Sequence, residues 1–519
     1  MTAPTAPAPG TARTARPGWF PPRWLVVTAV LVLALVLTDA VSQAVLPFIR
    51  RDDWPYLLPP DTPTVAGVVA KNLEEGRWLN SAWWYVVGQH STATSASLTY
   101  TAAYVVFVAG LWRLMRLRLP RLHWAVDALL GLTLFVSVIW VRLFYWPGTL
   151  TPSMLVAAAG VWTLPHVASS RLRLGTWLLV LTVLSVLTYP PVGAVLFICA
   201  LVQVGVRPWR DLVLLAIGFA VSYAVGIALI YLLNKAAFGH FGLKIAAWRH
   251  PNPLVSLHDA RVNTMRLVRA DLRLAGIVWV PALVGLAASV MAVLDSSLRP
   301  AVVRVWFAVA VVVGLGSVQT LLTGIDTDPR GELWLWLAIV VPAALLLAGS
   351  ARSRRVGVAC LAVLTVVGVL TWRSDVGEHQ GSRREYSALV EQATRPRSDG
   401  VRPQVVLYQP KKEQNTTRGR ITAGTVRMMV RAAQDGVVPR WCTPRGVRTH
   451  RRRRGAGRRP RDGGRRRRPA PSRPALSTDY FTEPAVRPPT RCFSMIAKRM
   501  TTGTTAMTDA AKSWSQCCS

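Results

Sequence analysis

The chain has few cysteines and few acidic residues, and these shortages exclude several classes of protein. Its 519 residues include six cysteines, none at spacings typical of a zinc site or a disulfide framework. It also lacks the glycine-rich loop that cradles nucleotide phosphates and any Ser/His/Asp arrangement, which argues against nucleotide hydrolysis. Asp and Glu number 25 against 61 Lys and Arg, giving a net charge of +36. Such a charge raises the question of a nucleic-acid partner.

The distribution of the positive charge argues against that partner. Residues 440–519 hold 20 Lys and Arg against 4 Asp and Glu, and much of the remainder lies in short connections between apolar runs. Hydrophobic residues make up 51% of the chain, 21 residues are tryptophan, and the mean hydropathy is +0.32. This mixture predicts a multi-pass membrane protein whose partners include membrane lipids and no nucleic acid.

Apolar runs recur along the first 371 residues, and about 20 apolar residues suffice to cross a bilayer. The sequence therefore predicts an all-α fold, a polytopic transmembrane helix bundle of about 11 spans. Basic residues before the first run resemble a signal peptide, but the run is long and more runs follow, so we expect an uncleaved signal-anchor. The runs are 24–46, 97–114, 124–145, 151–168, 175–188, 190–206, 211–233, 275–295, 301–323, 332–349 and 355–371.

Arginines fall in alternate short connections, and cytoplasmic loops carry such an excess. This pattern predicts an N-terminus inside, with the Asp52 and Asp53 loop and the segment after Trp372 outside. A bacterial inner or plasma membrane is the expected location. We expect four regions: a cytosolic segment 1–23, a transmembrane domain 24–371, an extracytoplasmic segment 372–442 and a tail 443–519.

The last two regions differ sharply in composition. The extracytoplasmic segment is predicted to contain a helix, Tyr386–Thr394, and a short strand, 404–408. Beyond residue 443 the chain is rich in Arg, Pro, Gly and Ala without apolar periodicity, so it should be disordered. It is either a tail that binds nucleic acid or another anionic polymer or, as we favour, an out-of-frame product of a GC-rich gene.

Two of the predicted outer loops are long enough to hold helices. In the first, Thr62 and Pro63 look like an N-cap and first helical residue, an apolar face follows, and Gly76 is placed to end the helix. We expect this helix to lie in the membrane interface. In the second loop an apolar stripe (Leu254, Leu257, Met265, Val268 and Leu272) is flanked by Arg266, Arg269 and Arg273. These arginines either rest on anionic headgroups or contact a lipid phosphate.

Asp52 and Asp53 are candidate catalytic residues. A carboxylate outside the membrane can deprotonate an acceptor hydroxyl as a general base. Adjacent side chains diverge, so one carboxylate would be the base, while the other would orient an acceptor or pair with Arg50 or Arg51. The alternative is an acidic pair that only caps or anchors the loop.

Four further residues are candidates for substrate binding. Arginine offers a fork of donors suited to phosphate oxygens, which makes Arg330 the preferred ligand of a lipid-linked phosphate. Arg77 either binds phosphate or pairs with Glu74. Trp78 is either an interfacial anchor or a platform for a sugar face. Asp328 either serves the site or pairs locally with Arg330. No metal site or cofactor is expected, although the run 326–328 leaves a divalent cation open.

Three motifs give the chain a resemblance to a known family. Asp52-Asp53-Trp54, Gly76-Arg77-Trp78 and the start of a span at Tyr189-Pro190-Pro191 resemble the serotype-converting O-antigen glucosyltransferases, which are GT-C class integral-membrane glycosyltransferases. The resemblance is spread over residues 24–410. It implies a polyprenyl-phosphate-linked sugar donor used on the outer side of the membrane, with an aspartate of the first outer loop as catalytic residue. The Tyr189-Pro190-Pro191 site departs from the family's commoner Tyr-Gln pattern, so no functional role is carried onto it.

The expected function is therefore transfer of a sugar from a polyprenyl-phosphate-linked donor to a hydroxyl of an envelope glycan or glycolipid. The alternatives are a multi-span transporter or lipid flippase and a non-catalytic scaffold of the envelope. A transporter should place polar groups or broken helices near the middle of the membrane. The predicted spans are mostly apolar and the polar clusters lie outside, which favours chemistry at the surface.

Overall fold

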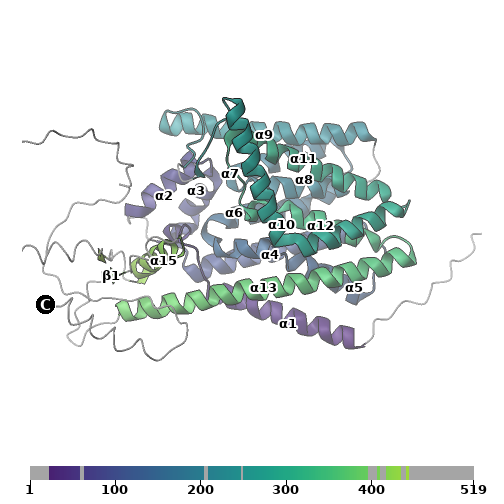
Figure 1. The fold of residues 1–519 in the computed structure, drawn as a ribbon, viewed down its shortest axis with the longest axis horizontal. Coiled ribbons are helices and arrows are strands. Elements are labelled where there is room, and N and C mark those ends of the chain that lie inside the picture. The colour runs from purple at the N-terminus through teal and green to yellow at the C-terminus, as the bar shows by residue number, and fades with distance from the viewer. Residues whose placement is uncertain are drawn as a thin grey trace, which may run out of the picture. The chain divides into compact units, whose positions relative to one another are not determined.

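The computed structural model describes residues 23–58, 63–203, 208–246, 249–394, 406–408, 417–433 and 440–442. The chain divides into two compact units, the first ending at Arg383 and the second beginning at Arg384. The described residues are mostly helical (Figure 1). In the second unit, β1 (Val406–Tyr408) pairs in parallel with β2 (Arg440–Cys442), and α15 (Thr417–Ala433) lies between them in sequence.

The first unit begins with α1 (Arg23–Val45), and α13 extends from it into the second unit. Between them the helices are η1 (Trp54–Leu57), α2 (Pro63–Glu74), α3 (Trp78–Val86), η2 (Gly88–His90), α4 (Ala93–Arg116), α5 (Trp124–Phe135), η3 (Trp140–Tyr145), α6 (Pro147–Val167), α7 (Arg171–Thr188), α8 (Pro191–Gln203), α9 (Trp209–Phe238), α10 (Leu257–Leu294), α11 (Arg299–Thr323), η5 (Pro329–Gly331) and α12 (Trp334–Leu346). The last, α13, runs over Ala351–Thr394.

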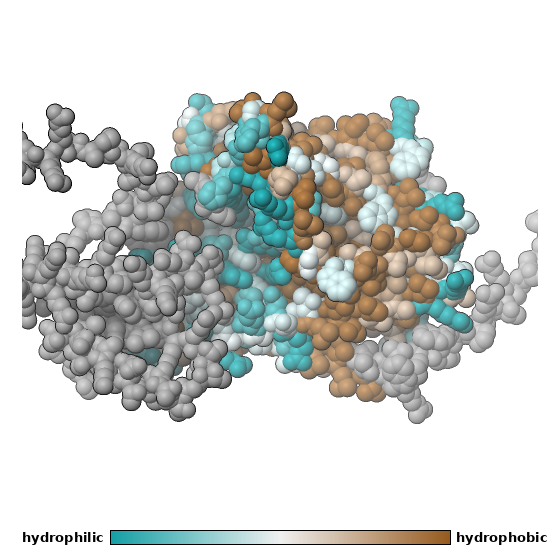
Figure 2. All heavy atoms as spheres, viewed as in Figure 1, coloured by the Kyte–Doolittle hydropathy of each residue, from teal (hydrophilic) through white to brown (hydrophobic). Residues whose placement is uncertain are grey.

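Within the described residues, six helices are long and apolar enough to cross a membrane: α4, α7, α9, α10, α11 and α13. Four shorter apolar helices accompany them: Val30–Val45 of α1, α5, α8 and α12. Figure 2 shows an apolar surface on the first unit, bounded on two sides by polar side chains. Such a band is what a helix bundle exposes to lipid. The prediction of a helical membrane protein is thereby confirmed.

Polar contacts gather at two ends of the helix bundle. At one end, which we call the short-loop end, Asp295 of the α10–α11 turn accepts a hydrogen bond from the Ser353 hydroxyl at 2.9 Å. Ion pairs link Arg116 to Asp127 at 3.2 Å and Arg171 to Asp211 at 2.9 Å in the same set of short connections. The other end, the long-loop end, holds the described parts of the connections 46–92, 239–256 and 324–333, with α2 and α3 (Figure 1).

The predicted span 124–145 is wrong as a continuous helix, because α5 ends at Phe135 and the chain resumes as η3. The carbonyls near the break still find donors inside the protein. The Tyr104 hydroxyl donates to the Phe135 carbonyl at 2.6 Å, and the Trp336 indole donates to the Thr133 carbonyl at 3.1 Å. Irregular backbone at membrane depth is tolerated only where protein or water satisfies it in this way.

Two helices are longer than predicted. The basic segment of the second long loop is the start of α10, whose 38 residues would extend roughly 57 Å. Likewise, the predicted separate helix Tyr386–Thr394 is the end of α13, which continues from the last apolar run without a break. The strand expected at 404–408 is confirmed for Val406–Tyr408. Residues 1–22, Thr62 and the tail from 443 lie outside the described residues.

Candidate functional site

Asp53 is buried at the N-terminus of α6. Its side chain is 0% exposed, and its Oδ2 accepts a hydrogen bond from the Gly148 N–H at 2.6 Å. Its Oδ1 accepts from the N–H of Thr149 at 2.9 Å and from the hydroxyl of the same residue at 2.7 Å. A Cβ at position 148 would lie 3.0 Å from Oδ2, so the close approach favours glycine there. Asp53 thus satisfies free N–H groups at the start of a helix, where negative charge is favoured.

The pKa of Asp53 and its geometry point in different directions. Burial raises the pKa to about 7, although the Thr149 hydroxyl and the Gly148 and Thr149 N–H groups oppose the rise. A pKa near neutrality would suit a general base. However, both carboxylate oxygens are already occupied and the side chain has no contact with solvent. Access to the reacting proton comes first, so the geometry argues against Asp53 as the base.

Asp52 is exposed and points to a different partner. Its Oδ1 accepts a hydrogen bond from the Trp146 indole N–H at 2.9 Å. The two carboxylates therefore diverge as their adjacency predicts, and the Asp53 carboxylate accepts hydrogen bonds from the first turn of α6 rather than pairing with the side chain of Arg50 or Arg51. A single hydrogen bond leaves Asp52 able to accept another proton or hydrogen bond from solvent or substrate.

Trp146 connects three segments of the long-loop end. Its ring centroid lies 4.1 Å from the guanidinium carbon of Arg330 and 5.5 Å from that of Arg50. Cations at such distances are attracted to the face of an indole ring. Because the same indole donates to Asp52, Trp146 brings a carboxylate of the first long loop together with Arg330 of loop 324–333. Trp146 was not among the candidates predicted from the sequence, because it follows an apolar run in a turn without charges.

Arg330 keeps part of its guanidinium available. Its side chain is 29% exposed, and its Nε lies 3.8 Å from Asp328 Oδ1, a loose contact for an ion pair. The Asp328 carboxylate also accepts from the Arg330 backbone N–H at 3.0 Å, and the Tyr189 hydroxyl donates to the Arg330 carbonyl at 3.2 Å. The local pairing with Asp328 is therefore present, yet its main effect is to shape the turn.

Two more arginines lie near Arg330. Burial raises the pKa of the Tyr189 hydroxyl to about 12, against the lowering effect of Arg330 and Arg77. Burial also lowers the pKa of Arg249, and Arg77 and Arg330 add to that decrease while Glu75 opposes it. Like charges disfavour the charged form of a neighbouring group, so each of these guanidinium groups lies within electrostatic range of Arg249. Arg77, Arg249 and Arg330 come from three separate segments and influence the same groups electrostatically, and we refer to them together as the cationic cluster.

The acidic residues beside the cluster are paired. Glu75 lies 3.6 Å from Arg249 and 3.7 Å from Lys71. Glu74 lies 3.1 Å from Lys244, so it pairs with the second long loop rather than with Arg77, which was one of the two alternatives for that arginine. The start of α2 at Pro63 and its left-handed Gly76 (φ +89°) agree with the sequence prediction. The helix is bound to loop 239–256 through both glutamates.

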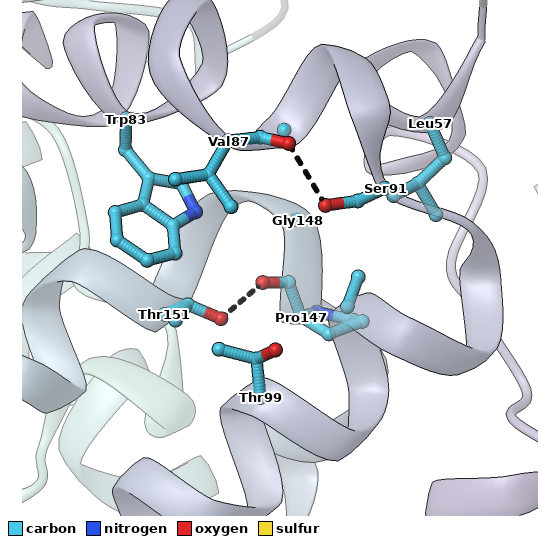
Figure 3. Close-up of a pocket in the computed structure, with 10 residues that line it drawn as sticks. Leu57, Trp83, Val87, Ser91, Thr99, Pro147, Gly148 and Thr151 are labelled. Atoms are coloured by element: carbon cyan, nitrogen blue, oxygen red, sulfur yellow. Dashed lines mark hydrogen bonds between the residues drawn. The ribbon is translucent and has the colours of Figure 1, made fainter.

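The tryptophans of α3 have mainly packing contacts. Trp78 donates from its indole to Asn234 Oδ1 at 3.1 Å and packs against Phe238, while Trp84 is only 4% exposed. Trp83 lines a cavity of about 10 Å³ together with Val87, Thr99, Thr151 and others (Figure 3). A cavity of that size holds one water at most, so it is too small for a sugar. Trp78 therefore packs against α9 and does not form an open platform for a sugar.

No group of three or more His, Cys, Asp or Glu side chains suited to a metal ion occurs among the described residues. The site instead consists of an exposed carboxylate, an indole and arginines. Comparison with protein-family models, with curated proteins and with solved structures finds no match for this chain.

Proposed function

We propose that the chain is a membrane-embedded glycosyltransferase that moves a sugar from a polyprenyl-phosphate-linked donor to a hydroxyl of an envelope glycan or glycolipid. One observation carries the proposal: a single side chain, Trp146, contacts both the exposed carboxylate of Asp52 and the guanidinium of Arg330. A base and a phosphate ligand in one place are what this reaction requires. The resemblance of the first-loop motifs to GT-C glucosyltransferases supports the same chemistry.

The proposed reaction is a single displacement at the anomeric carbon. The acceptor oxygen forms a bond to that carbon as the bond to the phosphate oxygen breaks, and the configuration inverts. Asp52 takes the proton of the acceptor hydroxyl as general base. Arg330 stabilises the charge that develops on the departing polyprenyl phosphate, and the positive charge of Arg77 adds to this effect. Asp53 holds the start of α6, and Asp328 holds the turn that presents Arg330.

We further propose that the bundle crosses the membrane 11 times in a bacterial inner or plasma membrane, with the N-terminus inside. Six helices meet the length and hydropathy required; α1, α5 with η3, α6, α8 and α12 would supply the rest. Alternation of the connections then places the long-loop end outside. The arginines of the short loops support this orientation, because positive charge is retained on the cytoplasmic side.

Arg51→Cys is expected to react with a membrane-impermeant maleimide in intact cells, because residue 51 is exposed at the long-loop end. Arg354→Cys, exposed in the opposite short-loop end, is expected to react only after the membrane is permeabilised. The parent chain, with its own cysteines, provides the blank to subtract. Labelling of position 354 but not position 51 in intact cells would reverse the proposed orientation.

Arg330→Gln is expected to lower the kcat/KM for the lipid-linked donor by about 100-fold, since a charge-assisted contact to phosphate is lost. The kcat/KM of Arg330→Lys should lie between those of the wild type and Arg330→Gln, because lysine keeps the charge but lacks the fork of donors. Steady-state transfer with varied donor in membrane vesicles would measure both. Arg273→Gln is the control: Arg273 is 63% exposed and pairs with Asp326, so the expected change is within about twofold.

A transporter or lipid flippase is the second candidate, and the break between α5 and η3 is the observation that favours it. Broken helices in transporters line a substrate site. Here the break is packed by the buried Trp140, Trp336 and Tyr104, whose polar atoms serve backbone carbonyls. The polar groups that could meet a substrate lie at the long-loop end instead. Movement of lipid-linked sugar across vesicles without sugar transfer would support the transporter.

A further inference from the structure

His379 of α13 lies against the segment that leads into Asp52. The side chain is 8% exposed, and its ring stacks on Tyr145 with centroids 3.8 Å apart and an interplanar angle of 17°. Phe48 packs edge-on against the same ring at 4.8 Å. Other residues of α13 bind this segment too: Gln380 donates to the Leu46 carbonyl at 3.0 Å and Arg383 to the Pro47 carbonyl at 3.2 Å.

The hydrogen bonds of His379 fix its protonation state. An Arg50 guanidinium nitrogen lies 2.9 Å from His379 Nε2. Guanidinium groups only donate, so Nε2 must accept. The other ring nitrogen, Nδ1, lies 2.6 Å from the Asp375 backbone carbonyl and therefore carries the proton that it donates. The imidazole is thus neutral, with a single tautomer compatible with both partners.

Arg50 in turn lies beside Trp146, whose indole donates a hydrogen bond to Asp52. Its guanidinium carbon is 5.5 Å from the centre of the Trp146 ring, and its backbone N–H donates to the Tyr145 carbonyl at 3.0 Å. The Tyr145 hydroxyl donates to the Asp375 carboxylate at 2.6 Å. One turn of α13, from Asp375 to His379, therefore contacts both Arg50 and Tyr145, the residue before Trp146.

We propose that His379 is a positioning residue for the site: its neutral imidazole holds Arg50 beside Trp146, and protonation of the ring releases Arg50. An imidazolium would direct an N–H at the Arg50 guanidinium and add a like charge to it. The charged and titratable groups that face the ring are Arg50 from the segment before Asp52, Tyr145 from η3, and Asp375 and Glu378 from α13. The two carboxylates attract the imidazolium toward α13, while Arg50 repels it.

His379→Gln is the test, because glutamine can accept from Arg50 and donate to the Asp375 carbonyl but cannot be protonated. Wild-type kcat is expected to fall severalfold, but by less than about tenfold, from pH 7.5 to pH 5.5, because burial lowers the pKa of His379 below the usual range of imidazole. The kcat of His379→Gln should equal that of the wild type at pH 7.5 and should not decline at pH 5.5. The kcat of His379→Ala should be about tenfold below that of the wild type at pH 7.5 and should stay low at pH 5.5. The KM for the lipid donor should stay unchanged, since the effect acts through Asp52.

This inference rests on the proposed function for its kinetic part, so thermal unfolding in detergent provides a separate measurement. The wild-type midpoint should drop further than that of His379→Gln between pH 7.5 and pH 5.5. If the unfolding difference is present but neither protein transfers sugar, the proposed function fails and the positioning role stands. The positioning role is overturned if His379→Gln has the same kcat and the same unfolding midpoint as the wild type at both pH 7.5 and pH 5.5. It is also overturned if His379→Gln does not fold at pH 7.5.

Discussion

Asp52→Asn is expected to abolish sugar transfer while the protein still inserts and folds. The amide keeps the shape of the carboxylate and its oxygen can still accept from the Trp146 indole, but it cannot take a proton from an acceptor hydroxyl. Loss of a general base typically costs a factor of about 10² to 10⁴ in rate. Transfer of labelled sugar in membranes from cells expressing each variant, normalised to protein level, would measure the loss.

The matched control for this substitution is Asp326→Asn. Asp326 is also a loop carboxylate of the long-loop end, with a side chain 37% exposed, but its partner is Arg273 at 3.2 Å. Its replacement is expected to change transfer by no more than about twofold. Equal losses in the two variants would mean that Asp52 acts through surface charge alone and is not the base.

Asp53→Ala is expected to destabilise the protein by about 3 kcal/mol. The substitution removes the acceptor of three hydrogen bonds, so the N–H groups of Gly148 and Thr149 and the Thr149 hydroxyl lose their partner inside the protein. Buried donors without a partner cost more than the bond itself contributes. Denaturant or thermal unfolding in detergent, together with the yield of folded protein, would measure the change.

Asp52→Ala is the control for the stability measurement, because that side chain is exposed and its replacement should change stability by less than about 0.5 kcal/mol. Together the two positions separate chemistry from folding. A stable but inactive protein with Asp53→Ala, combined with an active Asp52→Asn, would assign the base to Asp53 and contradict the proposed roles.

The apolar runs of the sequence identified the membrane class because hydropathy acts over a whole segment. Each run falls largely within helical structure, and the start of α2 at Pro63 follows from local chain geometry. Failures occurred where tertiary contacts override the local pattern. The break after Phe135 leaves no signal in an apolar run, since the donors that satisfy it, Tyr104 and Trp336, come from distant helices.

Helix ends were the second source of error. The start of α10 and the end of α13 carry many charged residues, so hydropathy separated them from the spans that they continue. A helix does not need to end where it leaves the apolar layer, because its backbone hydrogen bonds are internal. The charged residues therefore show where each apolar run ends but not where each helix ends.

The charged residues of the candidate site could be predicted from the sequence, but the contacts that join them could not. Asp52 and Arg330 stand out as polar residues between apolar runs. Their common neighbour Trp146 does not, because tryptophan is frequent in this chain and usually anchors helices at the interface. The cap formed by Asp53 was equally hidden, since its partners Gly148 and Thr149 are 95 and 96 residues away. His379 likewise lies 329 residues from Arg50.

The most direct measurement is a comparison of envelope glycans from cells that lack the gene, express the wild-type chain or express Asp52→Asn. Mass spectrometry should show a substituent of one sugar residue with the wild type that is missing in the other two strains. Identical glycans with and without the wild-type chain would contradict sugar transfer, and an unchanged substituent with Asp52→Asn would contradict the role of Asp52.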